Sequence, residues 1–390
     1  MVGQKVRDEP TKQGDFNESR WSWPVLRDAQ KSVLRDVLVH GPRSRAELTH
    51  RSGMSRASLS RLTRELADLG LMHEGAALSE DRRGRPSEVM ELVAESAYFV
   101  GVKLTGDALY GAVTDLTVHV VHSEGQPLTT TVVSDVVAQI SQFVERIRKR
   151  FKRVAAIGVC LAGDVTFVDG KAVVRGSDFL GWNEVNLEEL VSRATDLPVA
   201  INNDVQALTT AHHWFGPGVG KNPFAVISLG EGIGSGIVAD EQVVTGAHGR
   251  PGRIGHLPVT GDGPTCDRGH IGCVSAYVTV PAILRNSGGA GFWETLDAAK
   301  RGDERAEKAF RDAGTALGAA VAMLANIVDP ESILITGEAL DVARFASKQM
   351  EESIQMRLDP GSSFPNVELG EFEFTDYAWG AAINAIRTLV

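Results

Sequence analysis

Residues 44–69 constrain this chain most strongly, because their pattern predicts two short helices joined by a tight turn. Ser44 followed by Glu47 is the capping-box signature of a helix start, and Gly53 is suited to end that helix. Ser55 can cap a second helix, in which apolar residues recur at helical spacing and predict one buried face. That face consists of Leu59, Leu62, Leu66 and Leu69. The arrangement is typical of a helix-turn-helix, whose second helix enters the major groove of DNA.

The opposite face of the second helix carries arginine and serine, which can contact guanine edges and phosphates. The alternative is an ordinary solvated surface helix, but the following sequence favours DNA binding. A basic turn, with Arg85 between Gly84 and Pro86, and a strand-like run at residues 88–93 predict a β-wing that enters a narrow minor groove. The predicted DNA-binding residues are Ser55, Arg56, Ser58, Ser60, Arg61 and Arg64 on the helix, and Arg82, Arg83 and Arg85 on the wing.

The charge of the chain is divided unevenly. The whole chain carries 40 Lys and Arg against 50 Asp and Glu, a formal net charge of -10. Residues 1–90 hold 16 basic and 13 acidic residues, a balance of +3, so the other 300 residues hold 24 and 37, a balance of -13. An acidic body is repelled by phosphate, so the basic N-terminal part is the expected DNA-binding unit.

The rest of the chain predicts a two-lobed body. No apolar run reaches the length of a membrane span, and no signal peptide precedes the polar N-terminus, so a cytoplasmic protein without membrane contact is expected. Strand-like segments, a glycine-containing turn and helices occur once from residue 98 and again from residue 224, which predicts a duplicated α/β fold with a site between two lobes. We expect a disordered tail at residues 1–22, a winged helix-turn-helix with its linker at 23–95, and the two-lobed domain at 96–390.

Four motifs of this body occur in the order and spacing of the ROK family: Gly230 to Gly236 with alternating glycines, Asn203-Asp204, Gly255-His256, and Cys266-x-x-Gly-x-x-Gly-Cys273. The sequence resembles that family of bacterial sugar kinases and repressors over roughly residues 96–390. The resemblance implies an actin/hexokinase-like (ribonuclease H-like) fold with two lobes. The N-terminal winged helix is similar to that of the transcriptional regulators in the family.

The resemblance also implies that the kinase chemistry is lost. Kinases need two glycine turns around the nucleotide phosphates and a carboxylate for the metal. The metal-side aspartate of the first turn is Lys103 here, Asp107 replaces a threonine, and Glu231 replaces the threonine of the second turn. Thr336 stands at the first glycine of the adenosine-side pair. Carboxylates repel phosphate, so we expect no ATP binding and no enzyme activity.

The sugar-binding residues of the family are only partly kept. The resemblance assigns sugar contacts to Asn203, Asp204 and His256, with Asp204 as the former catalytic base, although Asn-Asp before a helix is also an ordinary N-cap. Arg253 and Ser275 replace two sugar-binding glutamates. Because arginine binds phosphate well, one interpretation is a sugar-phosphate effector, and the other is a decayed effector site in a dimer scaffold. The predicted ligand-binding residues are Asn203, Asp204, Arg253, His256 and Ser275.

The family's structural zinc site is altered as well. The resemblance implies one histidine and three cysteines as ligands, but the middle cysteine is Arg268 here. His256, Cys266 and Cys273 remain, and His270 can replace the missing ligand. A structural zinc ion is therefore a prediction, and its alternative is two buried thiols beside a packed histidine.

The function expected from these observations is a DNA-binding transcriptional regulator, a repressor of carbohydrate or amino-sugar genes. A homodimer or a dimer of dimers would bind a pseudo-palindromic double-stranded operator, and a sugar or sugar-phosphate effector would act through the linker at residues 87–95. The alternatives are a glucokinase-like ROK sugar kinase with an appended domain and a DNA-binding dimer without an effector.

Overall fold

The computed structural model describes residues 21–75 and 89–390. Most of the predicted tail, residues 1–20, lies outside the described part, as do the predicted wing arginines Arg82, Arg83 and Arg85. Within the described part, no helix is long and apolar enough to cross a membrane.

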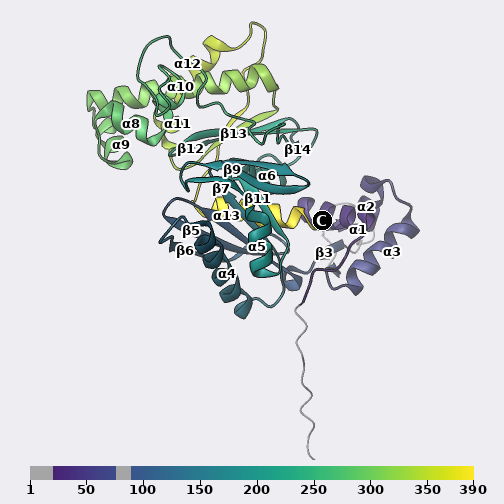
Figure 1. Cartoon of the computed structure of the whole chain (residues 1–390). Coiled ribbons are helices and arrows are strands. Elements are labelled where there is room, and N and C mark those ends of the chain that lie inside the picture. The colour runs from purple at the N-terminus through teal and green to yellow at the C-terminus, as the bar shows by residue number, and fades with distance from the viewer. Residues whose placement is uncertain (1–20, 76–88) are drawn as a thin grey trace, which may run out of the picture.

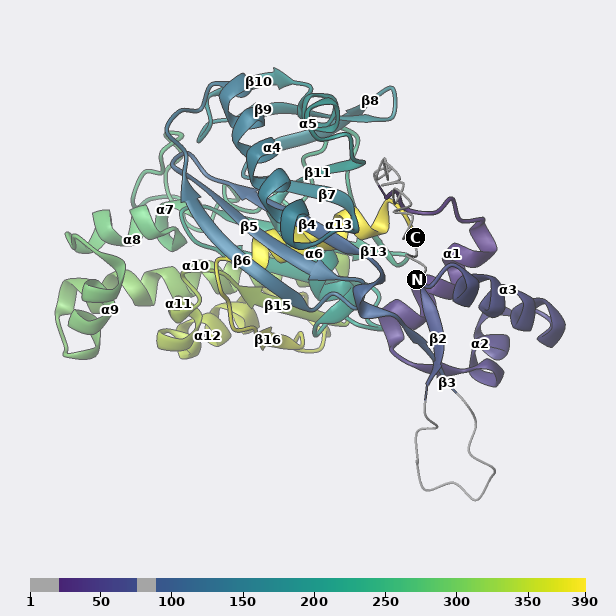
Figure 2. The ribbon, with the colours of Figure 1, turned by 90° about the horizontal axis from the view of Figure 1, so that it is seen from below.

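The N-terminal unit is a winged helix (Figures 1 and 2). Three helices, α1 (Asp28–His40), α2 (Arg45–Ser52) and α3 (Arg56–Asp68), pack beside a small antiparallel sheet of order β1-β3-β2. Its strands are β1 (Arg43–Ser44), β2 (Met72–Gly75) and β3 (Val89–Leu92). Leu34, Leu59 and Leu66 are among its fully buried side chains, so the leucine spine predicted for the second helix forms the core of this unit.

The caps of α2 and α3 are those predicted. The Ser44 amide donates to Glu47 Oε2 at 2.8 Å and the Glu47 amide donates to Ser44 Oγ at 3.2 Å, which satisfies two amides at the start of α2. Gly53 ends α2 with a left-handed φ of 66°. Leu69 was predicted wrongly as a member of the buried face, because it lies just past the last turn of α3 and is 45% exposed.

The body consists of two lobes with one topology. The first sheet has the order β11-β7-β4-β5-β6 and the second the order β14-β13-β12-β15-β16. In each sheet the first three strands of the chain form an antiparallel meander, and two later strands add in parallel on its other side. The strands are β4 (Tyr98–Leu104), β5 (Ala108–Asp115), β6 (Val120–Pro127), β7 (Val154–Leu161) and β11 (Val199–Asn203), then β12 (Phe224–Leu229), β13 (Ile233–Ala239), β14 (Gln242–Val243), β15 (Ser332–Thr336) and β16 (Val367–Leu369). The predicted duplication of an α/β fold is confirmed.

Helices cover both sheets. In the first lobe these are α4 (Val133–Arg150), α5 (Leu187–Thr195) and α6 (Asp204–Phe215). In the second lobe they are α7 (Ser275–Val278), α8 (Val280–Ser287), α9 (Phe292–Lys300), α10 (Glu304–Val328), α11 (Asp341–Phe345) and α12 (Ser347–Arg357). The predicted single helix over residues 340–356 is divided at Ala346, whose φ of -110° and ψ of 32° are not helical.

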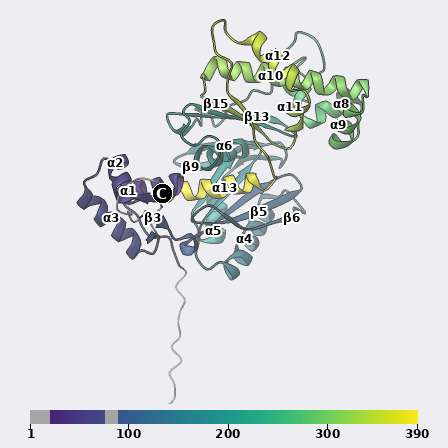
Figure 3. The same ribbon diagram turned by 180° about the vertical axis from the view of Figure 1, so that it is seen from behind.

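The last helix, α13 (Asp376–Arg387), returns to the first lobe and packs on β4, β7 and α6 (Figure 3). Its C-terminal half shares one hydrophobic cluster with the winged helix, in which Ile383 and Ile386 join Leu34 and Leu66. Trp23, just before α1, packs edge-on against Phe99 of β4 with ring centroids 5.9 Å apart. The winged helix is therefore seated on the first lobe by a continuous apolar core.

A third sheet of the body, of order β10-β9-β8, was not predicted. Its strands β8 (Asp164–Val168), β9 (Lys171–Ser177) and β10 (Trp182–Val185) extend the first lobe toward the second. The sixth strand of the predicted series also differs, since the segment from Val118 begins with a left-handed turn residue (φ 62°) and the strand β6 starts at Val120.

Candidate functional site

The outer face of α3 carries the predicted recognition residues. Arg56, Arg61 and Arg64 are exposed. The Arg61 Nε lies 4.0 Å from Glu65 Oε1, whereas Arg56 and Arg64 form no ion pair with any described residue. This helix lies on the side of the winged helix turned away from the two lobes (Figure 2).

Two of the predicted serines have a local role. Ser55 is the N-cap of α3: its Oγ accepts from the Ser58 amide at 3.2 Å and donates to Ser58 Oγ at 3.0 Å. Both hydroxyls are thus engaged at the helix start, and Ser60 is the serine whose hydroxyl remains beside Arg56 and Arg64 on the outer face.

The former kinase site contains a buried ion pair. Lys103, near the end of β4, is 3% exposed, and Asp204, the first residue of α6, is 8% exposed. The Lys103 ammonium donates to Asp204 Oδ2 and lies 4.4 Å from the centroid of the Tyr377 ring. Burial alone lowers the pKa of Lys103, but the facing carboxylate of Asp204 outweighs burial, and the pKa of Lys103 is raised. Lys103 is therefore charged, and Asp204 is held as its counter-ion instead of facing a substrate hydroxyl.

The phosphate side of the same cleft carries carboxylates. A Cβ placed on Gly230 would lie 1.6 Å from Glu338 Oε2, so the Glu338 carboxylate covers this glycine of the second turn. Burial raises the pKa of Glu338 to about 7. Thr336, at the expected adenosine-side glycine, is fully buried and its hydroxyl has no hydrogen-bond partner among the described residues. Glu231 lies in the glycine turn itself and also contributes to the raised pKa of Glu338.

Asn203 serves as a cap. Its Oδ1 accepts from the amides of Val205 and Gln206 at 3.0 and 3.3 Å, and its Nδ2 donates to the Gly163 carbonyl at 3.0 Å. Every polar group of this side chain is thus engaged within the protein, in agreement with the N-cap alternative.

Arg253 reaches across the cleft. It forms an ion pair with Asp164 at the start of β8, and the Nε of Arg250 lies 2.9 Å from the other oxygen of the same carboxylate. Two guanidinium groups share one carboxylate, which leaves a local excess of one positive charge. The structure also brings His256 and Ser275 near each other, since the Ser275 amide donates to the carbonyl of Gly255 at 2.6 Å.

The predicted metal ligands form one cluster. Ligand atoms of His256, Cys266, His270 and Cys273 all lie within 4.8 Å of one another. Cys266 Sγ is 3.7 Å from Nδ1 of His256 and 3.7 Å from Nδ1 of His270, and Cys273 Sγ is 3.9 Å from Nδ1 of His256. Tetrahedral zinc, with bonds of ~2.3 Å to sulfur and ~2.1 Å to nitrogen, places such atoms roughly 3.6 Å apart. The four donors therefore fit zinc.

Arg268, which replaces the usual third cysteine, forms an ion pair with Asp178 of the first lobe. Its charge is paired there. Together with the Arg253–Asp164 pair, this contact ties the loop that carries the four donors to the first lobe.

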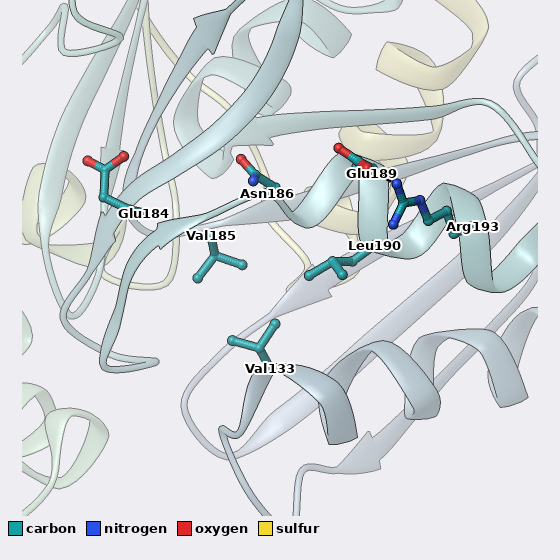
Figure 4. Close-up of a pocket in the computed structure, with 7 residues that line it drawn as sticks. All are labelled: Val133, Glu184, Val185, Asn186, Glu189, Leu190 and Arg193. Carbon is teal, nitrogen blue, oxygen red and sulfur yellow. Dashed lines mark ion pairs between the residues drawn. The ribbon is translucent and has the colours of Figure 1, made fainter.

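One cavity, of about 390 Å³, lies apart from all of these residues, on the outer side of the first lobe (Figure 4). It is lined by Val133, Glu184, Val185, Asn186, Glu189, Leu190 and Arg193. Glu189 and Arg193 form an ion pair one helical turn apart on α5. None of the predicted site residues lines it.

Sequence reasoning missed three residues of the cleft. Tyr377 stacks on the Lys103 ammonium, and its hydroxyl lies 2.9 Å from Ser228 Oγ in the second lobe. Asp164 and Glu338 were not singled out either. Their signal in the sequence is weak, because each residue meets its partner only after the two lobes have folded.

Comparison with known proteins places this geometry in a family. The model of the ROK family matches residues 99–386. The xylose repressor of Bacillus spizizenii is 23% identical over 86% of this chain and 89% of its own length, and the DNA-binding transcriptional repressor Mlc of Escherichia coli is 26% identical over 90% and 91%.

Solved structures agree. A ROK family transcriptional regulator described as a homolog of the Escherichia coli Mlc protein superposes with a TM-score of 0.79 at 26% identity, covering 92% of this chain and 96% of that one. A ROK family glucokinase from Streptomyces griseus shares the fold of the body, with a TM-score of 0.64 at 24% identity over 75% of this chain and 100% of its own. With its winged helix and its two lobes of one topology, this chain belongs to the ROK family.

Proposed function

We propose that this chain is a DNA-binding transcriptional regulator whose winged helix contacts the operator and whose two-lobed body transfers no phosphate. The observation that carries the proposal is the outer face of α3, where Arg56 and Arg64 are exposed and paired with no described residue, while the other face is buried in leucine. Arginine so placed is suited to guanine edges and phosphates. The relatives named as repressors support the same function.

The absence of kinase activity is proposed from the cleft. A catalytic base must accept a proton from the substrate hydroxyl, but Asp204 is the counter-ion of Lys103. The nucleotide side presents Glu231 and Glu338 where a kinase holds phosphate. Both features oppose the alternative of a ROK sugar kinase with an appended domain.

An effector of the sugar-phosphate class is proposed for the Arg250 and Arg253 side of the cleft. The excess positive charge over Asp164 supports an anionic group there. Relatives named as repressors of xylose and N-acetylglucosamine genes support the control of carbohydrate or amino-sugar genes. A homodimer, or a dimer of dimers, would present two α3 helices to a pseudo-palindromic operator.

A structural zinc ion is proposed at His256, Cys266, His270 and Cys273. When bound, it would crosslink the loop between β14 and α7, which contains few hydrogen-bonded strands or helices of its own. Cys266 and Cys273 are buried, as is usual for a site that stabilises a loop instead of reacting.

The DNA-binding proposal is tested with fluorescent duplexes recovered by selection from a random pool. Arg56→Ala and Arg64→Ala should each weaken binding by about 1–3 kcal/mol, or roughly 5- to 150-fold, because each removes a charged groove contact. Arg305→Ala is the matched control, since Arg305 is exposed on α10 far from the winged helix (Figure 1). Equal effects of all three variants would contradict the assignment of α3.

The catalytic and effector proposals have separate tests. A coupled assay with ATP and a panel of hexoses should give no turnover, and steady turnover would establish the kinase alternative. Calorimetric titration with hexoses and their 6-phosphates should give binding that requires the phosphate and is lost in Arg253→Ala. If neither class binds at this side of the cleft, the effector-independent DNA-binding dimer is the better account.

A further inference from the structure

A cavity of about 210 Å³ lies between the two lobes, and none of the predicted site residues lines it. The first lobe contributes β8 with Thr166 and Phe167, the end of β11 with Asn202, and Gln206 of α6. The second lobe contributes the loop at residues 245–249, which follows β14. A molecule in this cavity would contact both lobes at once.

The polar groups of the cavity have no partners within the protein. Gln206 is only 8% exposed, yet its side-chain amide forms no hydrogen bond with any described residue. The side chains of Asn202, Thr166 and Thr245 likewise form none among the residues the structure describes. Buried amides are normally hydrogen-bonded, so a buried glutamine that lines a cavity without a partner indicates that its partner enters from outside.

The wall from the second lobe is closely seated. A Cβ on Gly249 would lie 1.8 Å from the carbonyl oxygen of Val165, and Gly249 has a left-handed φ of 68°. Only glycine lets the loop approach β8 this closely. Arg250, the next residue, holds the loop through its 2.9 Å ion pair with Asp164. The cavity is thus formed by fixed backbone on both sides.

The character of the walls defines the ligand. Among the described residues that line the cavity, none carries a charge. Two amides and two hydroxyls can each donate and accept hydrogen bonds. Phe167 is 59% exposed and offers an aromatic surface to C–H groups. The volume is below the ~300–1,000 Å³ of pockets that hold drug-sized molecules.

We propose that this cavity binds a small uncharged molecule rich in hydroxyl groups, a polyol or a neutral monosaccharide. Its hydroxyls would pair with the amides of Gln206 and Asn202, and its C–H face would lie on Phe167. The site is separate from the Arg250 and Arg253 side of the cleft, whose charge favours an anion. By contacting β8 and α6 on one lobe and residues 245–249 on the other, the ligand stabilises their present separation.

The test is calorimetric titration of the full chain with xylose, glucose, N-acetylglucosamine, glycerol and inositol at millimolar concentrations. At least one should bind, and Gln206→Ala should weaken that binding by about 10-fold or more, because a site built to hydrogen-bond a hydroxyl loses about 1.4 kcal/mol or more with the amide. Thr245→Val, on the exposed loop of the other lobe, should weaken it too and leaves the core of the first lobe untouched.

Gln355→Ala on α12 is the matched control, since this glutamine is exposed and remote from the cavity. Arg253→Ala separates this site from the anion side of the cleft and should leave the neutral ligand bound. Two results would overturn the proposal: no binding of any of the five compounds, or binding that is lost in Arg253→Ala and retained in both cavity variants. DNA binding without ligand is measured independently, so failure here leaves the regulator proposal standing.

Discussion

At the scale of single residues, Lys103 determines what the cleft can do. Its ammonium is buried against Asp204 and the Tyr377 ring, where a kinase needs a free carboxylate. The substitution at position 103 is evident in the sequence. Its partner is not, because Lys103 and Asp204 are 101 residues apart and meet only when β4 and α6 are packed in one lobe.

Removing one member of this pair should be costly. Lys103→Met leaves Asp204 as an uncompensated buried charge, and we expect a loss of about 3–5 kcal/mol in the free energy of unfolding. The double variant Lys103→Met with Asp204→Leu removes both charges and should recover most of that loss. Denaturant unfolding of the three proteins measures both effects. A double variant no more stable than Lys103→Met alone would show that the pair is not the source of the loss.

Glu338 should make stability depend on pH. Its folded-state pKa of about 7 lies above the ordinary value of 4.5, mainly because of burial. The folded protein therefore holds this proton more tightly than the unfolded chain, so stability is highest below about pH 4.5 for this group and is lost as the pH rises to about 7. The difference corresponds to roughly 3 kcal/mol.

The measurement is unfolding of Glu338→Gln and of the parent protein between pH 5 and 8. The amide does not titrate, so the parent should lose stability relative to the variant as the pH rises. Parallel stability curves over this range would contradict the raised pKa of Glu338.

At the scale of elements, α13 joins the parts of the molecule. Its first turn places the Tyr377 hydroxyl 2.9 Å from Ser228 of the second lobe. Near its end, Arg387 lies within hydrogen-bonding distance of Thr210 on α6 (3.3 Å) and of Gln242 in the second lobe (3.4 Å). Its apolar residues belong to the core shared with the winged helix. We had expected the linker at residues 87–95 to connect body and winged helix, and its first two residues lie outside the described part.

The shared core predicts cooperative opening. Ile386→Ala removes a fully buried side chain from this core and should cost about 2–5 kcal/mol. Amide exchange should then accelerate in α1 and in β4 together. Ile354→Ala is the matched control, because Ile354 is equally buried in the separate core of the second lobe. Faster exchange in β4 while α1 keeps its protection would show that the winged helix is not coupled to α13.

The loop with the four metal ligands is a second element that can be tested. Elemental analysis should find one zinc per chain, and both Cys273→Ser and His270→Ala should lower that content, because His270 takes the place of the lost cysteine. Cys160→Ser is the control, since Cys160 is buried in the first lobe with a pKa raised to about 12 by burial. Full zinc in His270→Ala would exclude this histidine as a ligand.

Prediction of elements succeeded where local signals are strong. The capping box at Ser44, the cap at Ser55 and the glycine turn at residues 230–236 specify helix starts and a hairpin through neighbours in sequence. The sheet of β8, β9 and β10 was missed because its strands have short and mixed patterns and are defined by contacts between the lobes.

At the scale of the whole molecule, charge and shape separate two tasks. The basic balance of residues 1–90 coincides with the winged helix, and the acidic balance with the two lobes. The lobes lie to one side of the winged helix, so α3 can approach a duplex while the acidic body stays away from it (Figure 3). The arrangement agrees with a regulator in which the body changes the position of the winged helix.

The most direct test of this account is selection of duplexes from a random pool by the purified full chain, followed by footprinting of the recovered sequences. The account predicts an inverted repeat with half-sites about 10 base pairs, or a multiple of that, from centre to centre, and loss of the repeat when Arg56 and Arg64 are both replaced by alanine. Recovery of no preferred sequence at modest salt, or of the same repeat by the double variant, would contradict it.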